Sequence, residues 1–372
     1  MINANGKRYL LGMNLSISEY INQSEQWGKS LLGAQCYAED VLRMNTDLSM
    51  PILRVPMAVL GEVDSNCTVW QGSSLPKSGQ YEAINYRYDD NLLFGVIELS
   101  ETLFDENKDK TPLQQATESA YSQIFSLLDK LSFPYLFRMW NYMADINDQS
   151  FGLERYVQFN LGRQDAFLSH GRDVVGNVPA ACALGFESTL DKDNLTQDSL
   201  VISFLAGRVE PQYIENPRQL SAYQYPQQYG PRSPTFSRAS LVALGSDELF
   251  FLSGTASIVG HKTLHPNDVI AQTHETIANI NAVLVMLNSR DIQSKLDLSD
   301  LHYTVYVRHI NDLDTIRNEL KLCIGDKIKA TYLQASVCRQ DLLLEIEATA
   351  GHSMVKSFSQ SDLKDLNNEC AN

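Results

Sequence analysis

The feature that most constrains the fold is an order of elements that occurs twice in the chain. In the second half, short apolar runs rich in β-forming residues alternate with segments whose apolar residues recur at helical spacing. These patterns predict strand, helix, strand, helix and two strands at residues 249–258, 268–287, 302–310, 312–324, 330–338 and 342–348.

The first half predicts the same order, at residues 91–100, 111–131, 134–147, 152–168, 178–186 and 199–206. Individual residues also correspond, because QATE at 115–118 matches QTHE at 272–275, and IND occurs at both 146–148 and 310–312. The two matches have different separations, which indicates insertions in loops. We therefore predict an internal duplication. The alternative is a chance likeness between two generic α+β patterns.

Charge and cysteine content narrow the classes of function. The 372 residues carry a formal net charge of −15, which argues against broad nucleic-acid or anionic-membrane binding because both need a basic surface. Six cysteines form no C-x-x-C pair, so neither a zinc site nor a redox motif is indicated. No secretory leader and no apolar run of membrane-spanning length is recognised. We expect a cytoplasmic protein with free thiols.

Two stretches lie outside the repeat. Residues 1 to about 85 hold strand-like runs, such as 52–61, among many turn residues. Residues 213–239 are dense in Pro, Tyr, Gln and Arg, a composition too aromatic for a flexible linker. An ordered loop of this kind on a scaffold is a place where binding residues tend to lie.

Four runs in the second half resemble the reactive-intermediate deaminase family, also called the YjgF family. They are YGPRSPTFSRA (229–239), FFLSGTASIVG (250–260), VIAQTHETIANINAVL (269–284) and LLLEIEA (342–348). Combined with a first half of the same predicted fold, the loop YQYPQQYGPRSPTFSRA and the run VCRQDLLLEIEA, they resemble the chorismatases. That family releases pyruvate from chorismate and leaves a cyclohexadiene diol acid or a hydroxybenzoate.

The resemblance implies an α+β fold of two diverged YjgF-like, or chorismate-mutase-like, units. Each unit is expected to be a mixed sheet packed on two helices. We expect a degenerate N-terminal domain with an extension at 1–210, a catalytic domain at 211–350 and a tail at 351–372. A fused pair can build within one chain the cleft that deaminase relatives build between subunits, which implies a monomer or a loose dimer.

Glu345 is the candidate acid. In the strand LLLEIEA, Leu343, Glu345 and Glu347 face one side, and a carboxyl group buried among apolar neighbours has a raised pKa and can donate a proton near neutral pH. The alternative is that Glu345 and Glu347 lie on a solvent-exposed face of the strand and have no catalytic role. The resemblance implies the first glutamate of EIE as the catalytic one. The matching strand of the first half, SLVISFLAG, has no acid, and Ile202 or a neighbour takes its place.

Cys338 and Ala256 bear on the product. On its predicted strand Cys338 is either a small core thiol or a site residue, and the resemblance links a cysteine here to the branch that makes hydroxybenzoate. Ala256 in SGTASI resembles the hydrolytic branch instead. The mixture looks most like members that make both 3- and 4-hydroxybenzoate.

A substrate with two carboxylates requires arginines, whose planar fork donates two parallel hydrogen bonds. The candidates for substrate binding are Arg155, Arg163, Tyr229, Arg232 and Arg339. A surface ion pair is the alternative for each arginine, and Arg238 is left as equally well structural. His261 and His265 have the spacing of a metal pair, but no helix is expected there.

Three functions remain open. A chorismatase would need Glu345 and several arginines in one cleft, with chorismate as partner and no cofactor, since protonation of the enol ether needs no metal. An imine deaminase like the single-domain relatives would need an arginine near position 330, where Ala330 stands. A non-enzymatic carboxylate-binding protein would need no acid.

Overall fold

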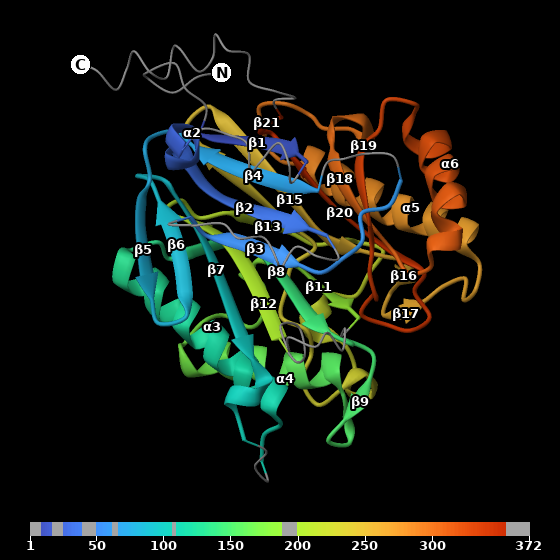
Figure 1. Ribbon diagram of the computed structural model, residues 1–372. Coiled ribbons are helices and arrows are strands. Elements are labelled where there is room, and N and C mark those ends of the chain that lie inside the picture. Colours follow the sequence, from blue (N-terminus) through green and yellow to red (C-terminus); the bar gives the residue numbers. More distant parts are fainter. Residues whose placement is uncertain are drawn as a thin grey trace.

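Three sheets form the scaffold of the computed structural model, which describes residues 9–16, 25–38, 50–61, 66–105, 109–187 and 199–354. A five-stranded sheet has the order β21-β1-β4-β2-β3, and two six-stranded sheets follow it along the chain. Figure 1 shows the helices α3 and α4 on one outer side of the molecule and α5 and α6 on another. A core of apolar side chains from all three sheets fills the centre.

The first six-stranded sheet has the order β11-β8-β12-β7-β6-β5. Its strands are β5 (Lys77–Tyr81), β6 (Ile84–Tyr88), β7 (Leu92–Ser100), β8 (Tyr135–Ala144), β11 (Ala180–Phe186) and β12 (Ser199–Gly207), and its helices are α3 (Pro112–Leu131) and α4 (Arg155–Ser169). Thr111 caps α3 through its side chain and proline stands in the first turn, where its missing N–H costs nothing. The two helices approach closely at Gly162, where a Cβ would lie 2.2 Å from the Gln114 carbonyl oxygen. A short hairpin of β9 (Gln149–Ser150) and β10 (Leu153–Glu154) precedes α4.

The second six-stranded sheet has the order β13-β14-β15-β20-β18-β19. Its strands are β13 (Gln212–Ile214), β14 (Ala239–Leu244), β15 (Asp247–Thr255), β18 (His302–Val307), β19 (Lys329–Gln334) and β20 (Leu344–Ala350), and its helices are α5 (Val269–Asn288) and α6 (Leu313–Ile324). Asp268 caps α5 through its carboxylate, as its place before the apolar periodicity suggests. The small pair β16 (Ile258–Val259) and β17 (Lys262–Thr263) stands apart.

The predicted duplication is confirmed, because the two six-stranded sheets have one topology. Read from the strand after the second helix, the orders β11-β8-β12-β7 and β19-β18-β20-β15 correspond, with the first pair parallel and the others antiparallel. Several predicted bounds differ by a few residues, and one difference affects the candidate site: the strand expected at 330–338 ends at Gln334, so Cys338 lies in the connection to β20. That connection crosses β18, which lies between β19 and β20 in the sheet.

The five-stranded sheet carries the same order a third time, which the sequence did not predict. Its strands are β1 (Leu10–Leu15), β2 (Leu31–Tyr37), β3 (Ile52–Val55), β4 (Cys67–Gly72) and β21 (Ser353–Met354), with the short helix α2 (Glu25–Ser30) before β2. The order β3-β2-β4-β1 has the parallel and antiparallel pairs of the other two sheets. The run predicted as a strand at 52–61 is a strand only over its first residues, and Val59 continues as a bridge to Leu333.

Three tyrosines at corresponding positions meet where the sheets converge. Tyr37, Tyr142 and Tyr306 each lie opposite the parallel neighbour strand, paired with Val55, Leu184 and Leu333. The hydroxyl of Tyr142 is 2.9 Å from each of the other two hydroxyls. Burial raises the pKa of all three, so the hydroxyls stay neutral and share hydrogen bonds. The molecule is therefore organised as three related units around one buried tyrosine cluster.

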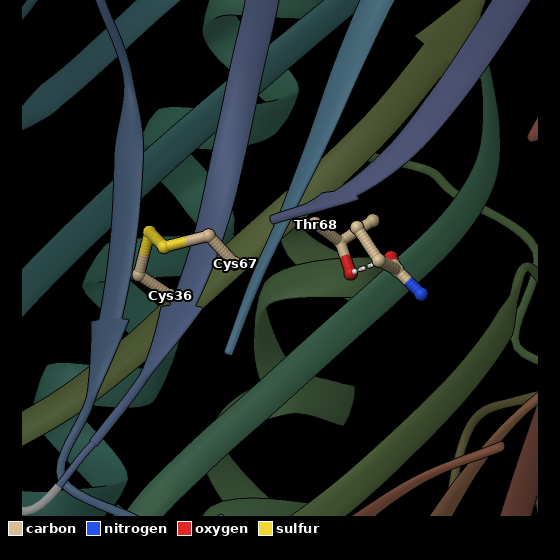
Figure 2. The surroundings of a disulfide bond; sticks show 4 residues. Cys36, Cys67 and Thr68 are labelled. Atoms are coloured by element: carbon tan, nitrogen blue, oxygen red, sulfur yellow. Dashed lines mark hydrogen bonds between the residues drawn. A yellow bond between two sulfur atoms is a disulfide. The ribbon is translucent and has the colours of Figure 1, made fainter. Parts of the chain in front are cut away.

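The expectation of free thiols is wrong for one pair. Cys36 on β2 and Cys67 on β4 are directly opposite in the antiparallel ladder, with Cα atoms 4.1 Å apart, and a disulfide joins them (Figure 2). On the neighbouring position of β4, the Thr68 hydroxyl donates to the Asn14 side chain of β1 at 2.9 Å. No sequence motif marks this pair, because strand register alone brings the two residues together. Cys182, Cys323 and Cys338 are free thiols, and Cys370 lies outside the described residues.

The domain limits remain a proposal. The division at 210 and 211 falls in the connection between β12 and β13, and the tail predicted at 351–372 is described only to Met354, where β21 pairs with β1. Among the described residues, no helix is both long and apolar enough to cross a membrane.

Candidate active site

A cavity of about 440 Å³ lies between the two six-stranded units. The first unit contributes α4 and β11, and the second contributes β15, β20 and the loop that precedes β14. Most of the predicted site residues line it, namely Glu345, Cys338, Arg163, Tyr229, Ala256 and Arg339. The aromatic loop within 213–239 supplies further walls, including Tyr225, Tyr229 and Phe236.

Glu345 lies on β20 with its side chain in this cavity and 4% of the residue exposed. Burial raises the pKa of its carboxyl group to about 8, and the nearby charge of Glu347 adds to the rise. The strand β15 makes room for it: a Cβ at Gly254 would lie 1.8 Å from Glu345 Oε1. At neutral pH this carboxyl group is therefore mainly a neutral acid facing a cavity, and it can donate a proton.

Glu347 faces the same side of β20 but has different partners. The Arg138 guanidinium forms an ion pair with it, and the Trp140 indole N–H donates to Oε1 at 3.1 Å. The side chain lines a separate small cavity beside the five-stranded sheet rather than the large one. The two glutamates of EIE are thus distinguished by environment, a difference that the sequence left open.

Two thiols, one buried and one partly buried, flank the acid. Cys338 Sγ lies 3.9 Å from Glu345 Oε2, and burial raises the pKa of this thiol to about 12. Cys182 of β11 also lines the cavity, and burial raises its pKa well above the usual value. Both are therefore neutral thiols near neutral pH. The sequence analysis missed Cys182, which sits in an apolar strand with no motif around it.

Arg163 and Arg238 are buried cations that line the cavity. Arg163 donates to Asn160 Oδ1 at 2.7 Å, and Arg238 donates to the Leu220 carbonyl at 2.8 Å and the Tyr225 hydroxyl at 3.0 Å. The Nε atom of each is buried without a hydrogen-bond partner. Within the described part of the chain, neither guanidinium forms an ion pair with a carboxylate. Buried cations usually have anionic partners, so the pair suits an anionic ligand.

Arg339 and Tyr229 form another wall of the cavity. The Arg339 guanidinium lies over the Tyr229 ring at 4.3 Å and donates to the His261 carbonyl oxygen at 3.0 Å. The Tyr229 hydroxyl donates to the same carbonyl oxygen at 2.7 Å. These contacts hold an aromatic face and a cation at the edge of the cavity. His265 turns away to Glu275, at 3.7 Å, so the two histidines do not converge.

Two predicted ligands do not reach the cavity. Arg155 begins α4, is buried, and donates through Nη1 to Glu101 at 3.0 Å and through Nε to the Ala144 carbonyl at 2.8 Å, so it is already paired in the first unit. Arg232 is half-exposed, with its closest carboxylate on Asp165 at 3.7 Å. The eight-residue spacing of Arg155 and Arg163 places both on α4, but only Arg163 is beside the cavity. Arg238, left undecided before, takes the place that we expected for Arg232.

This arrangement combines a neutral acid, aromatic walls and two buried guanidinium groups that form no ion pair among the described residues, all in one cavity. It can bind a small molecule with more than one carboxylate and deliver a proton to it. Ala256, buried with 4% exposure, lines the cavity together with Ile258. Among the described residues, no cluster of His, Cys, Asp and Glu could hold a metal ion.

Comparisons with known proteins give a consistent match. The family model described as chorismatase FkbO/Hyg5-like, N-terminal, matches residues 68–206. A 3-hydroxybenzoate synthase of Streptomyces hygroscopicus is 33% identical over 86% of this chain and 91% of its own length. A chorismatase of Streptomyces rapamycinicus is 33% identical over 77% of this chain and 82% of its own. A crystal structure of a chorismatase superposes with a TM-score of 0.76 and 29% identity, covering 92% of this chain and 98% of that one.

Proposed function

The chain belongs to the chorismatase family, and we propose that, as an enzyme acting on chorismate, it cleaves the enolpyruvyl ether to give pyruvate and a hydroxybenzoate. The observation that carries the proposal is the buried acid Glu345 in a cavity lined by two buried guanidinium groups that, in the described part of the chain, form no ion pair with a carboxylate. A dianionic enol ether needs both features, namely cations for its carboxylates and a proton donor for its methylene carbon.

Substrate binding falls to the buried arginines. We assign Arg163 and Arg238 to the two carboxylates, because both residues line the cavity, are held by hydrogen bonds and form no ion pair with a carboxylate among the described residues. Arg339 and Tyr229, stacked on each other, bound the same space and supply a further cation and an apolar face. Arg232, which is half-exposed outside this wall, is no longer among the proposed ligands.

The chemical step begins with Glu345. Its neutral carboxyl group transfers a proton to the methylene carbon of the enol ether, and the resulting oxocarbenium ion carries the positive charge next to the new carboxylate of Glu345. In the route without water, the bond between the ring carbon and the ether oxygen breaks, the ether oxygen becomes the carbonyl oxygen of pyruvate, and that ring carbon receives the ring hydroxyl oxygen in its place. If the ring hydroxyl is used and the ring loses a proton, chorismate divides into pyruvate and a hydroxybenzoate without added water. The proton lost from the ring balances the proton delivered to the methylene carbon.

Two observations favour a hydroxybenzoate as product. Cys338 lies beside Glu345 in the cavity, where a thiol can contact the ring, and one relative is named a 3-hydroxybenzoate synthase. The alternative is attack by water, which would give the dihydroxycyclohexadiene carboxylate, and Ala256 resembles that branch. We propose 3- and/or 4-hydroxybenzoate as the main product.

The cavity is built within one chain, which supports a monomer or a loose dimer as the working state. We also keep the cytoplasm as the proposed location.

The experiment is to incubate the purified protein with chorismate and to measure pyruvate by a coupled lactate dehydrogenase assay. We expect pyruvate from the wild-type protein and at least about 100-fold less turnover from Glu345→Gln, since general acid catalysis is worth about 10²–10⁴-fold. Gln keeps the size of the side chain, so chorismate binding, measured by calorimetry, should survive. Equal turnover in both proteins would contradict the role of Glu345, and an absence of pyruvate from the wild-type protein would contradict the function.

A further inference from the structure

A second carboxylate stands two residues from the proposed acid on the same face of β20. Glu345 is paired across the ladder with Tyr306 and Glu347 with Thr304. Both are buried, with 4% and 6% exposure. Two carboxyl groups so close in a dry interior cannot both ionise without cost, because like charges repel strongly at low dielectric.

The carboxyl groups of Glu345 and Glu347 differ in the hydrogen-bond donors around them. Glu347 receives an ion pair from Arg138 and a hydrogen bond from the Trp140 indole, both on β8 of the first unit. The Arg138 guanidinium also lies over the Trp140 ring at 5.2 Å, which fixes its direction. Among the described residues, the hydrogen-bond contact of the Glu345 carboxyl group is a weak one with the Cys338 thiol, at 3.9 Å. Strong donors favour the ionised form, so Glu347 takes the charge and Glu345 keeps its proton.

We propose that Glu347 is a positioning residue, which Arg138 and Trp140 hold as a fixed negative charge so that Glu345 remains a proton donor. The proposal rests on the function proposed for Glu345. It assigns Glu347 a part in the reaction without contact to the substrate, since Glu347 lines the other, smaller cavity.

The repeat supplies an independent argument. Strand register identifies the residues equivalent to Glu347 in the other two units. Glu347 pairs with Thr304; the equivalent residues are Ser203, which pairs with Trp140, and Thr68, which pairs with Gln35. Val201, which pairs with Tyr142 as Glu345 pairs with Tyr306, is apolar. Of the three units, only the one that has the acid also has the neighbouring carboxylate. At the position of Glu347, the other two units have the short hydroxyl side chains of Ser203 and Thr68, so packing of the strands does not require a carboxylate there.

Several groups face Glu345 and set its protonation. They are Glu347 on β20, Arg138 on β8, Cys182 on β11, Tyr156 on α4, Arg238 before β14 and Cys338 before β20. The two arginines and the Cys338 contact lower the pKa of Glu345, while burial and the Glu347 charge raise it. The effect of Glu347 on the pKa of Glu345 is larger than that of Arg138, so the Glu347–Arg138 ion pair as a whole favours the neutral form of Glu345.

The test uses two variants. Glu347→Gln removes the negative charge and leaves the Arg138 cation, so the midpoint for ionisation of Glu345 should fall by at least about one pH unit. The double variant Arg138→Gln/Glu347→Gln removes both charges, so its midpoint should lie between those of the single variant and the wild type. A purely structural role predicts the double variant to be at least as impaired as the single one.

Two measurements report the pH midpoint for ionisation of Glu345. The first is pyruvate-release turnover at saturating chorismate against pH, where Glu347→Gln should lose about tenfold relative to wild type at pH 9 and little at pH 6. The second is infrared titration of the buried carboxylic acid in the substrate-free protein, assigned by its loss in Glu345→Gln. This readout needs no activity, so it tests the pair even if chorismate is not the substrate.

An unchanged midpoint in Glu347→Gln, or a double variant whose midpoint lies at or below that of the single variant, would overturn the proposal. If the single variant does not fold, the double variant still decides, because its midpoint must then lie below that of the wild type.

Discussion

The substitution Gly254→Ala tests the placement of the acid most sharply. A Cβ at Gly254 would lie 1.8 Å from Glu345 Oε1, 2.7 Å from Cδ and 3.3 Å from Cys182 Cβ. An ordinary contact needs at least about 3.4 Å, so the carboxyl group must move by roughly 1.5 Å. It is the end of a flexible side chain, so we expect a loss of about 1–3 kcal/mol in the free energy of unfolding, within the range for overpacking.

The loss of activity should be much larger than the loss of stability. A misplacement of 1 Å can cost about 100-fold in rate, so kcat for pyruvate release should fall at least that far. KM should change little, because Arg163 and Arg238 lie on other elements. The assay compares kcat, KM and urea unfolding of Gly254→Ala with those of Gly28→Ala, whose new Cβ would meet no atom within 4 Å. Near-normal kcat in a folded Gly254→Ala protein would refute the position or the role that we give to Glu345.

Further predictions concern pH, the thiol, the arginine and the disulfide. The raised pKa of Glu345 predicts that kcat is highest below pH 7 and falls as pH rises through about 8, and a rate that is flat to pH 10 would count against a neutral acid. The same shift has a consequence for stability: the contribution of neutral Glu345 is fully present below pH 4 and is lost as pH rises toward 8, which urea unfolding of wild type and Glu345→Gln can compare. Cys338→Ala should slow aromatisation or raise the share of the diene diol acid seen by chromatography, whereas an unchanged product ratio and rate would make Cys338 a packing residue. Arg163→Met should raise KM for chorismate at least about tenfold, and calorimetry showing wild-type affinity would remove it from the site. Reduction of Cys36–Cys67, which are 31 residues apart, should lower the free energy of unfolding by roughly 3.7 kcal/mol in the chain-entropy model, and identical melting of oxidised and reduced protein would mean that the bond contributes nothing.

The repeat could be predicted from sequence because strand and helix periodicities are local properties. Each apolar face in α3 and α5 has its own pattern, and the order of elements follows from reading those patterns in turn. The third copy of the repeat, in the five-stranded sheet, was not predicted from the sequence. Its strands and its helix α2 are short, so they contain too few residues with a strand or helix periodicity to be compared with the other two copies.

The candidate site was predicted where a single strand or loop carries the information. Glu345 stands out as an acid within an apolar strand, and Tyr229 and Arg339 lie in segments of distinctive composition. The site residues that were wrongly predicted or missed are those whose role depends on contacts between segments far apart in the sequence. Arg155 reaches Glu101, a partner that helical spacing cannot reveal, and Gly254 is required by the carboxyl group of a strand far along the chain.

The difference between Glu345 and Glu347 is also a tertiary property. On one strand the two residues are equivalent by alternation. Only the approach of β8 from the first unit, with Arg138 and Trp140, separates an ionised carboxylate from a neutral acid. The sequence therefore located the pair, and the family resemblance, rather than any local pattern, selected between them.

The measurement that tests the central claim most directly is the mass spectrum of pyruvate formed from chorismate in D2O and trapped at once as lactate. If Glu345 exchanges its proton with solvent and delivers it to the methylene carbon, each methyl group should carry one deuterium, and a hydroxybenzoate should form in equal amount. A methyl group without deuterium would mean that hydrogen passes directly from the ring to the methylene carbon, and it would contradict general acid catalysis by Glu345.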